Sequence, residues 1–291
     1  MASQLHFEKW QGTGNDFVLA SQHITKSFTR DISSLAREIC DRHFGVGADG
    51  FITIGGSEKA DFRMRMWNPD GSESGMCANG LRCVGGHLVL HGLSGGEEPI
   101  AIETGKGVIK LEFPTPPDWV EISGFWIQAD MGEPILEREK IPVAGKEGTQ
   151  AVNETMVIPG TTQKTEFTAV GMGNPHAVIF VVGLDDVPLE EWGPEIENYT
   201  DLFPERVNVE FVQIINKTHV RMRVWERGAG ITLSCGSGTA AVQAACHLTE
   251  RAGDILRVDV PGGSIRTEYT DKGTILLAGP AVHVFDGVWN G

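Results

Sequence analysis

The chain has 291 residues, enough for two domains of about 150 residues each, and its 41% hydrophobic content can fill two cores. The net charge of −15 excludes nucleic acid and anionic membranes as partners, although a small anionic ligand can still bind where local donors outweigh the distant field. Met1 to Gln22 lacks a secretory signal pattern, and five cysteines do not make a disulfide framework. We therefore expect a protein of the reducing cytoplasm that does not enter membranes.

The first half of the chain reads as short strands interrupted by two helices. Alternating hydrophobicity bounded by turn residues predicts the strands, and apolar residues spaced about 3.6 residues apart predict the helices. The expected order is strands at Leu5–Gln11 and Phe17–Ala20, a helix at Asp31–Cys40, strands at Phe51–Ile54 and Asp61–Trp67, a helix at Cys77–His91, and strands at Ile100–Glu103, Gly107–Phe113 and Glu121–Met131.

The second half repeats this order. Its expected elements are strands at Thr168–Val170 and Ala177–Val182, a helix at Leu189–Tyr199, strands at Val209–Ile214 and Thr218–Trp225, a helix at Gly236–Ala252, and strands at Leu256–Val260, Ser264–Tyr269 and Thr274–Phe285. In both halves one apolar helix starts at a cysteine, so we expect many strands wrapped around one buried helix. The sequence does not specify which strands pair.

Short motifs recur at a nearly constant offset and indicate a duplicated domain. Arg63–Trp67 (RMRMW) returns as Arg221–Trp225 (RMRVW), and a cysteine follows each Trp at the same spacing. Gly12–Asn15 (GTGN) likewise returns as Gly171–Asn174 (GMGN). Each copy therefore contributes one thiol, and two facing thiols can remove a proton from one side of a carbon and return one to the other. This is the chemistry of racemases and epimerases.

The positions of Cys77 and Cys235 favour reactive thiols. A helix N-terminus presents unpaired N–H donors and partial positive charge, which stabilise a thiolate and can also bind a carboxylate. The small residues after each cysteine leave the backbone open to a ligand. Packing as inert apolar groups is the alternative, and we expect it for the three cysteines on helical apolar stripes, Cys40, Cys83 and Cys246. A Cys77–Cys235 disulfide is a further alternative, as oxidative damage.

Other motifs are weaker. Gly45–Gly50 fits G-x-G-x-x-G but lies between a helix and a strand, the reverse of a dinucleotide loop. His87 and His91 have the spacing of a metal pair, but no metalloprotease pattern accompanies them, so two histidines near a helix surface are the favoured interpretation. Nothing marks a lysine for pyridoxal phosphate. We expect neither metal nor cofactor.

Polar residues at strand ends beside the cysteines suit a zwitterionic ligand. Arg227 could bind a carboxylate and Glu226 an ammonium group, although a solvent-exposed ion pair would look the same in sequence. Asn68 ends the matching strand of the first half. His176 could tune a thiolate, and a structural histidine is an equal alternative.

Taken in chain order, these residues resemble the diaminopimelate epimerase family. The motifs that carry the resemblance span nearly the whole chain: Gly12–Phe17, Asp41–Gly50, Asn68–Gly71, Met76–Gly80, Gly173–His176, Val207–Asn208, Trp225–Gly228 and Cys235–Gly238. The resemblance implies an α+β fold of two pseudo-symmetric domains, each a barrel-like sheet around a central helix. It implies domains at residues 1–131 and 132–277, with a C-terminal strand at about 278–291 returning to the first.

The resemblance also implies the activity and its residues. The activity is cofactor-independent epimerisation of LL- to meso-diaminopimelate, toward lysine and peptidoglycan, with Cys77 and Cys235 as acid and base. His176 and Glu226 would adjust the thiol pKa values. The implied substrate-binding residues are Asn15, Asn68, Ala78, Asn79, Asn174, Asn208, Glu226, Arg227, Gly236 and Ser237. Ala78 departs from the family, which usually has Gly there.

Two alternatives stay open. One is a related two-cysteine racemase of a simpler amino acid such as proline or histidine. The other is an amino-acid-binding protein without catalysis, which would not need paired cysteines. The expected partner is in every case an amino acid as small-molecule substrate or ligand, and the sequence is compatible with a homodimer.

Overall fold

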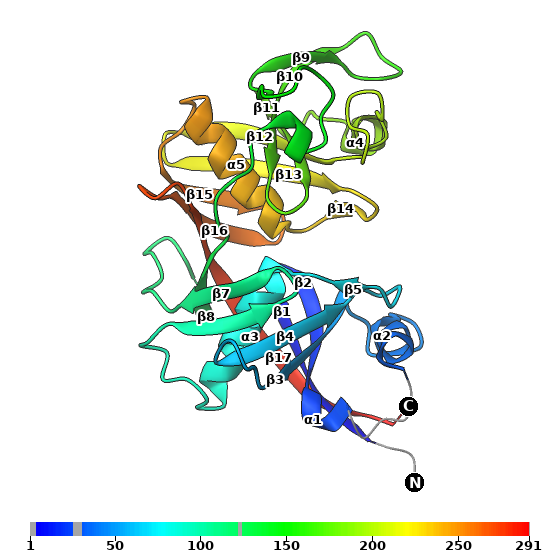
Figure 1. Ribbon diagram of the computed structural model, residues 1–291, viewed down its shortest axis with the longest axis vertical. Helices are drawn as coiled ribbons and strands as arrows, with labels where there is room; N and C mark the ends of the chain where they lie inside the picture. The colour runs from blue at the N-terminus through cyan, green and yellow to red at the C-terminus, as the bar shows by residue number, and fades with distance from the viewer. Residues whose placement is uncertain (1–3, 26–30, 122–123, 291) are drawn as a thin grey trace. The chain divides into compact units, whose positions relative to one another are not determined.

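The computed structural model describes residues 4–25, 31–121 and 124–290, which fall into two compact units. Unit 1 comprises Met1–Ala129 and Ala278–Gly291, and unit 2 comprises Asp130–Leu277 (Figure 1). Among the described residues, no helix has the length and apolarity needed to cross a membrane.

The described part of unit 1 is built from strands and three helices. Its elements are β1 (Leu5–Gly12), β2 (Asn15–Ser21), α1 (Gln22–Thr25), α2 (Ile32–Cys40), β3 (Gly50–Gly55), β4 (Phe62–Trp67), β5 (Glu73–Ser74), α3 (Ala78–Leu90), β6 (Ile100–Thr104), β7 (Gly107–Glu112), β8 (Phe125–Asp130) and β17 (Ile275–Trp289).

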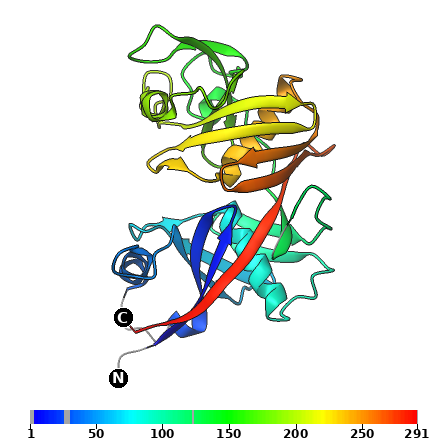
Figure 2. The same cartoon turned by 180° about the vertical axis from the view of Figure 1, so that it is seen from behind.

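The strand pairs of unit 1 close into a barrel. β1 pairs with β2, β2 with β3, β3 with β4, β4 with β6, β6 with β7 and β7 with β8. The C-terminal strand β17 completes the circuit, because it pairs with both β8 and β1, and Figure 2 shows it running beside β1. The barrel therefore has no free edge on this side.

Helix α3 fills the barrel of unit 1. It is buried on nearly every face, and most of its residues are small or apolar. Its glycines allow close approach to the wall: a Cβ at Gly86 would lie 2.7 Å from the Trp10 ring of β1, and one at Gly85 would meet Ile127 of β8 at 3.0 Å. Helix α2 lies outside the barrel, where Leu35 and Ile39 pack with Phe51 and Trp67.

Unit 2 repeats this plan. Its elements are η1 (Arg138–Lys140), β9 (Glu154–Val157), β10 (Lys164–Gly171), β11 (Pro175–Val181), α4 (Leu189–Glu197), β12 (Asn208–Asn216), β13 (His219–Glu226), β14 (Gly230–Thr232), α5 (Gly236–Leu248), β15 (Ile255–Val260) and β16 (Gly263–Tyr269).

The pairing pattern of the two units is the same. In unit 1 the pairs from β1 to β7 are antiparallel, parallel, antiparallel, parallel and antiparallel. The same succession runs from β10 through β11, β12, β13 and β15 to β16. Helix α5 takes the place of α3, with its alanines in the apolar core of unit 2. The predicted α+β fold of two similar, helix-centred units is confirmed.

Several element ends differ from expectation. Helix α5 stops at Leu248 rather than Ala252, because Glu250 takes a left-handed φ of 53°. The strand expected from Glu121 starts at Phe125, and Ile122 and Ser123 of that prediction lie outside the described residues. The last strand continues to Trp289, four residues beyond Phe285, because β1 pairs with it from Val282 to Trp289.

Candidate active site

Cys77 caps the N-terminus of the central helix of unit 1. Its backbone is extended, with φ −140° and ψ 119°, and its carbonyl accepts the first helical hydrogen bond from Leu81 N at 2.8 Å. The Sγ atom accepts from Gly80 N at 3.5 Å. A sulfur in this position lies at the positive end of the helix, where negative charge is stabilised. The side chain is half-buried and reduced.

Cys235 occupies the equivalent position in unit 2. Its φ and ψ are −119° and 113°, its carbonyl accepts from Thr239 N at 2.9 Å, and its Sγ accepts from Gly238 N at 3.4 Å. The backbone N–H groups of the first helical turn have no intrahelical acceptor, so Ala78–Asn79 in one unit and Gly236–Ser237 in the other present donors beside a sulfur. The predicted start of each helix at a cysteine is confirmed.

Asn15 lies next to Cys77. The turn between β1 and β2 places it there, with Thr13 and Gly14 at positive φ. Its Oδ1 atom lies 3.8 Å from Cys77 Sγ and accepts from Asn79 Nδ2 at 3.1 Å. Its Nδ2 atom donates to Asp49 Oδ2 at 2.6 Å. Because Asp49 only accepts, this bond fixes which end of the Asn15 amide faces the thiol.

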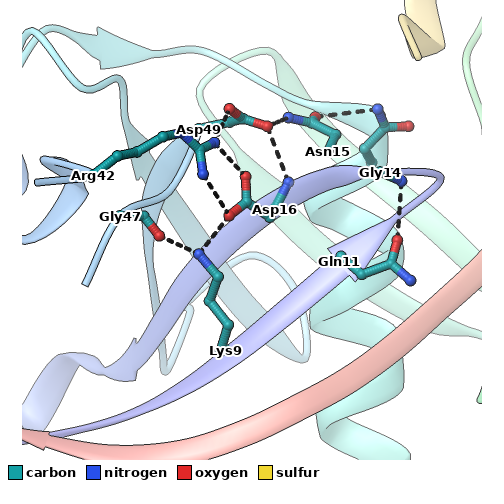
Figure 3. A network of polar contacts seen from close by, with 9 residues as sticks. Lys9, Gln11, Gly14, Asn15, Asp16, Arg42, Gly47 and Asp49 are labelled. Carbon is teal, nitrogen blue, oxygen red and sulfur yellow. Dashed lines mark hydrogen bonds and ion pairs between the residues drawn. The ribbon is translucent and has the colours of Figure 1, made fainter. Parts of the chain in front are cut away.

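Asp49 connects Asn15 to a network of charged residues (Figure 3). Asp49 also accepts from Asp16 N and from Arg42 Nη2, at 3.0 and 2.6 Å. Arg42 bridges to the Asp16 carboxylate at 2.7 Å, and Lys9 Nζ lies 2.5 Å from the same carboxylate. Burial raises the pKa of Asp16, but the hydrogen bonds from Arg42 and Lys9 outweigh burial and hold it below its ordinary value. The network therefore stays charged and supports the Asn15 turn.

Cys235 lies among acidic groups. Burial raises its pKa well above the ordinary value, and the carboxylates of Glu226 and Glu210 add to the effect. Ser237 Oγ lies 3.5 Å from Sγ and works in the opposite direction. Burial also raises the pKa of Glu226, against hydrogen bonds from the Thr232 hydroxyl and the Cys235 thiol. The thiol form of Cys235 is thus favoured in this environment.

His176 and Glu210 form a fully buried pair in unit 2. His176 Nδ1 lies 2.7 Å from Glu210 Oε1, and its Nε2 lies 2.9 Å from Asn174 Oδ1. Within the described part of the chain, the second Glu210 oxygen has no hydrogen-bond partner. A Cβ placed on Gly238 would come within 2.6 Å of Glu210 Oε1, so this carboxylate reaches the start of α5. Sequence reasoning missed Glu210, although a lone Glu inside the apolar strand Asn208–Asn216 was a usable signal.

The side chains of Asn208 and Arg227 form hydrogen bonds with backbone groups of the protein. Asn208 Nδ2 donates to Pro175 O at 2.8 Å, and its Oδ1 accepts from Arg227 N at 2.9 Å. It therefore ties the Asn174–His176 segment to the turn after β13. Arg227 Nη1 donates to Glu205 O at 2.7 Å. Asn68 closes the Asn68–Gly71 turn through Ser72, with Nδ2 to Oγ at 3.0 Å.

The structure groups most of the predicted residues by unit. In unit 1, Asn15, Cys77, Ala78 and Asn79 are together at the start of α3, and Asn68 has no described contact with them. In unit 2, Asn174 and His176 connect through Glu210 to the start of α5, where Glu226, Cys235, Gly236 and Ser237 lie. The functional roles of these residues stay predictions.

The fold is shared with solved structures of low sequence identity. A phenazine biosynthesis protein of the PhzF family from Bacillus anthracis superposes with a TM-score of 0.71 at 18% identity, over 98% of this chain and 99% of that one. A hydroxyproline epimerase from Agrobacterium vitis gives 0.69 at 14% identity, over 98% and 92%. The class of protein is thus the fold of two similar, helix-centred units that these solved structures share.

Sequence comparison narrows this class. The sequence profile described as diaminopimelate epimerase matches residues 7–136 and 168–284. Diaminopimelate epimerases of Leptospira biflexa and Desulfovibrio desulfuricans are 43% and 44% identical to this chain, over 98% and 99% of both sequences. The chain belongs to the diaminopimelate epimerase family.

Proposed function

We propose that this protein is an isomerase that converts LL- to meso-diaminopimelate, with Cys77 and Cys235 exchanging protons at one α-carbon and without a cofactor. One observation carries the mechanism: each unit presents a cysteine as the N-cap of a buried helix, with Sγ bonded to the third amide of that helix. Membership of the family supplies the substrate.

The proposed reaction conserves protons. One cysteine, as thiolate, takes the α-hydrogen, and the electron pair left on carbon spreads onto the adjacent carboxylate. Helix-start N–H groups hydrogen-bond that carboxylate and stabilise its added charge, which is commonly the largest contribution to such catalysis. The other cysteine, as thiol, delivers its proton to the opposite face. The first sulfur now carries a proton and the second is a thiolate, so the reverse reaction uses the same groups.

The environment of Cys235 suggests which group starts as the acid. Burial and two neighbouring carboxylates raise the pKa of its thiol, so Cys235 holds a proton at neutral pH. We therefore assign Cys235 as the proton donor and Cys77 as the base for the substrate isomer that the resting protein accepts. After turnover on that isomer the roles are exchanged.

The substrate assignment also rests on the polar groups around each helix start. Asn15 offers an amide near Cys77 Sγ and Asn174 offers one beside His176, while Glu226 and Arg227 offer charge for a second amino-acid end. Asn208 would act by holding Pro175 and Arg227 in place. We further propose that the protein works in the cytoplasm, where reducing conditions keep both thiols free. A homodimer stays a prediction, to be checked by light scattering.

Isotope incorporation during turnover in D2O tests the two-thiol mechanism. A thiol exchanges its proton with solvent between turnovers, so the delivering sulfur carries deuterium. Early product should carry solvent deuterium at the inverted centre, while recovered substrate keeps its hydrogen. Early product that retains substrate hydrogen would point to a single base serving both faces and would overturn the mechanism.

Alanine variants test the same assignment independently. Cys77→Ala and Cys235→Ala should each abolish epimerisation, since each turnover needs an acid and a base. Cys40→Ala and Cys246→Ala, which remove buried cysteines elsewhere, should keep most activity. Equal activity on proline or another amino acid without a second amino-acid end would reassign the substrate to the simpler racemase class.

A further inference from the structure

The far end of α3 carries a cluster of metal-binding side chains that the proposed reaction does not use. His87 lies in the last turn of the helix and His91 is its C-cap, so their i, i+4 spacing puts both rings on one face. The Glu8 carboxylate of β1 lies between them, with Oε2 at 2.8 Å from His87 Nδ1 and Oε1 at 2.6 Å from His91 Nε2. These three ligand atoms lie within 4.8 Å of one another.

A bulge in the β1–β17 ladder brings two more ligands to the same carboxylate. Residues three apart on a regular strand point to opposite faces. Here Lys9 pairs with Phe285 and Trp10 with His283, so the ladder skips one residue of β17. His283 and Asp286 consequently meet, with Nε2 at 3.1 Å from Oδ1, and both ligand atoms lie within the same 4.8 Å limit of Glu8.

In this cluster the Glu8 carboxylate is held in a fixed orientation, and the His91 side is exposed to solvent. Trp10 Nε1 donates to Glu8 Oε2 at 2.6 Å, which is the kind of outer contact that orients metal ligands. The side chains of Glu8 and His87 are 13% and 17% exposed, whereas His91 is 47% exposed. An ion could therefore enter from the His91 side and keep a water ligand there.

We propose that Glu8, His87 and His91 bind one zinc ion, or a similar first-row divalent ion, with His283 and Asp286 completing or supporting the coordination. Two imidazoles and a carboxylate form a donor set that zinc accepts, with a fourth position for water or a further side chain. The present contacts of 2.6 and 2.8 Å would have to open to about 3.4 Å between neighbouring tetrahedral ligands. Rotation of partly exposed side chains can supply this change.

The bound ion would fasten three elements of unit 1. Glu8 belongs to β1, the two histidines to the end of α3, and His283 and Asp286 to β17. Since α3 begins at Cys77 and ends at this cluster, zinc would anchor the end of the helix that lies farthest from the thiol. The expected effect is resistance of unit 1 to unfolding, while the chemistry at Cys77 proceeds without metal.

The equivalent helix in unit 2 provides a matched comparison. His247 lies in the last turn of α5, as His87 does in α3, and its Nδ1 lies 2.6 Å from Asp254 Oδ1. This pair does not belong to any group of three ligand atoms among the described residues. Loss of His247 should therefore leave zinc binding unchanged.

Calorimetric titration with zinc chloride tests the proposal. The protein is the full chain carrying Cys77→Ala and Cys235→Ala, so that the two candidate catalytic thiols cannot bind the metal. We expect one equivalent to bind and to raise the thermal unfolding midpoint. Adding His91→Ala or Glu8→Gln should weaken binding by about 100-fold or more, and Trp10→Phe by about 10-fold, as for ligands and their outer contacts. Adding His247→Ala should change nothing.

Cobalt supplies a second readout. Bound Co²⁺ should give visible d–d absorption without the thiolate charge-transfer band, since the donors are nitrogen and oxygen. Circular dichroism checks that each variant folds, and the partly exposed His91 makes His91→Ala the safest of them. Unchanged zinc affinity in folded His91→Ala, or no saturable binding at millimolar zinc, would overturn the proposal.

Discussion

At the residue scale, Asp49 is the group that decides how Asn15 faces Cys77. A carboxylate must accept from the Asn15 amide, whereas an asparagine in its place can donate and let that amide turn over. We expect Asp49→Asn to lower kcat by about 10-fold or more, the size of one lost charged hydrogen bond, with a smaller change in KM. Steady-state kinetics measure this split.

Asp185→Asn is the matched control for Asp49→Asn. It removes the same charge from a carboxylate that pairs with Arg221 at the surface of unit 2, at 3.1 Å. We expect its kinetics to match the parent protein. If Asp49→Asn loses thermal stability but keeps its kcat, Asp49 supports the fold only and does not position Asn15.

The raised pKa of Cys235 predicts its pH dependence. Alkylation requires the thiolate, and a free thiol has an ordinary pKa of about 8.5. Because the pKa of Cys235 is raised above the ordinary value, the rate at which iodoacetamide modifies Cys235 in the Cys77→Ala variant should still rise with pH above about 8.5. Mass spectrometry of the labelled peptide gives the rate. Adding Glu226→Gln removes a negative neighbour and should move the profile to lower pH. A rate that levels off near neutral pH would contradict this assignment.

The site residues that the sequence predicted have local sequence signals, whereas those that it missed have partners far away in the sequence. Cys77 and Cys235 were predictable as helix starts because each lies beside local turn and helix signals that repeat along the chain. Glu210 and Glu8 were not, because their partners come from distant parts of the chain: His176 in one case, His87 and His91 in the other. A buried ion pair or a cluster of potential metal ligands has no local sequence pattern when its residues are brought together only by folding.

At the element scale, the third residue of each central helix gives a matched pair of substitutions. A Cβ on Gly80 of α3 would meet the ends of the Ile52 and Met64 side chains, at 2.9 and 3.1 Å, and these can move. A Cβ on Gly238 of α5 would meet Glu210 Oε1 at 2.6 Å and Cys235 Sγ at 3.3 Å. That carboxylate is fully buried and held by His176.

We therefore expect opposite outcomes for the same chemical change. Gly80→Ala should be nearly neutral, because the helix propensity of Ala, about 1 kcal/mol better than Gly, offsets the local crowding. Gly238→Ala should lower stability by about 1–3 kcal/mol and reduce activity, because a buried charge must shift. Urea unfolding and kinetics of both variants check this. Equal effects would mean that Glu210 does not restrain the start of α5.

Elements were easier to predict than their pairing. Turn residues and periodicity located α3, α4 and most strands to within a few residues, because those signals are local. The parallel pairs β2–β3 and β4–β6, and the closure of the barrel by β17, depend on contacts between distant segments. The bulge that brings His283 and Asp286 together is of the same kind, since it exists only against β1.

At the scale of the whole molecule, the proposed chemistry needs only groups of the chain. We expect protein purified to full activity to show no cofactor absorbance and to keep its turnover after dialysis against a chelator. Turnover should persist even if the chelator removes zinc from Glu8, His87 and His91 and lowers the unfolding temperature. Absorbance spectra, steady-state assays and thermal scans before and after dialysis test this. Activity that is lost on dialysis and restored by metal or pyridoxal phosphate would contradict the thiol mechanism.

The path of β17 has a consequence for synthesis on the ribosome. Unit 2 is one continuous segment, Asp130–Leu277, whereas the barrel of unit 1 needs Ala278–Trp289 of β17, which are translated after unit 2. Until they emerge, β1 and β8 lack their shared neighbour, and the nascent chain carries two unpaired strand edges around an apolar helix. Unit 1 is therefore the first unit to be translated but is completed only after unit 2, and the growing chain has to be kept from aggregating until β17 emerges.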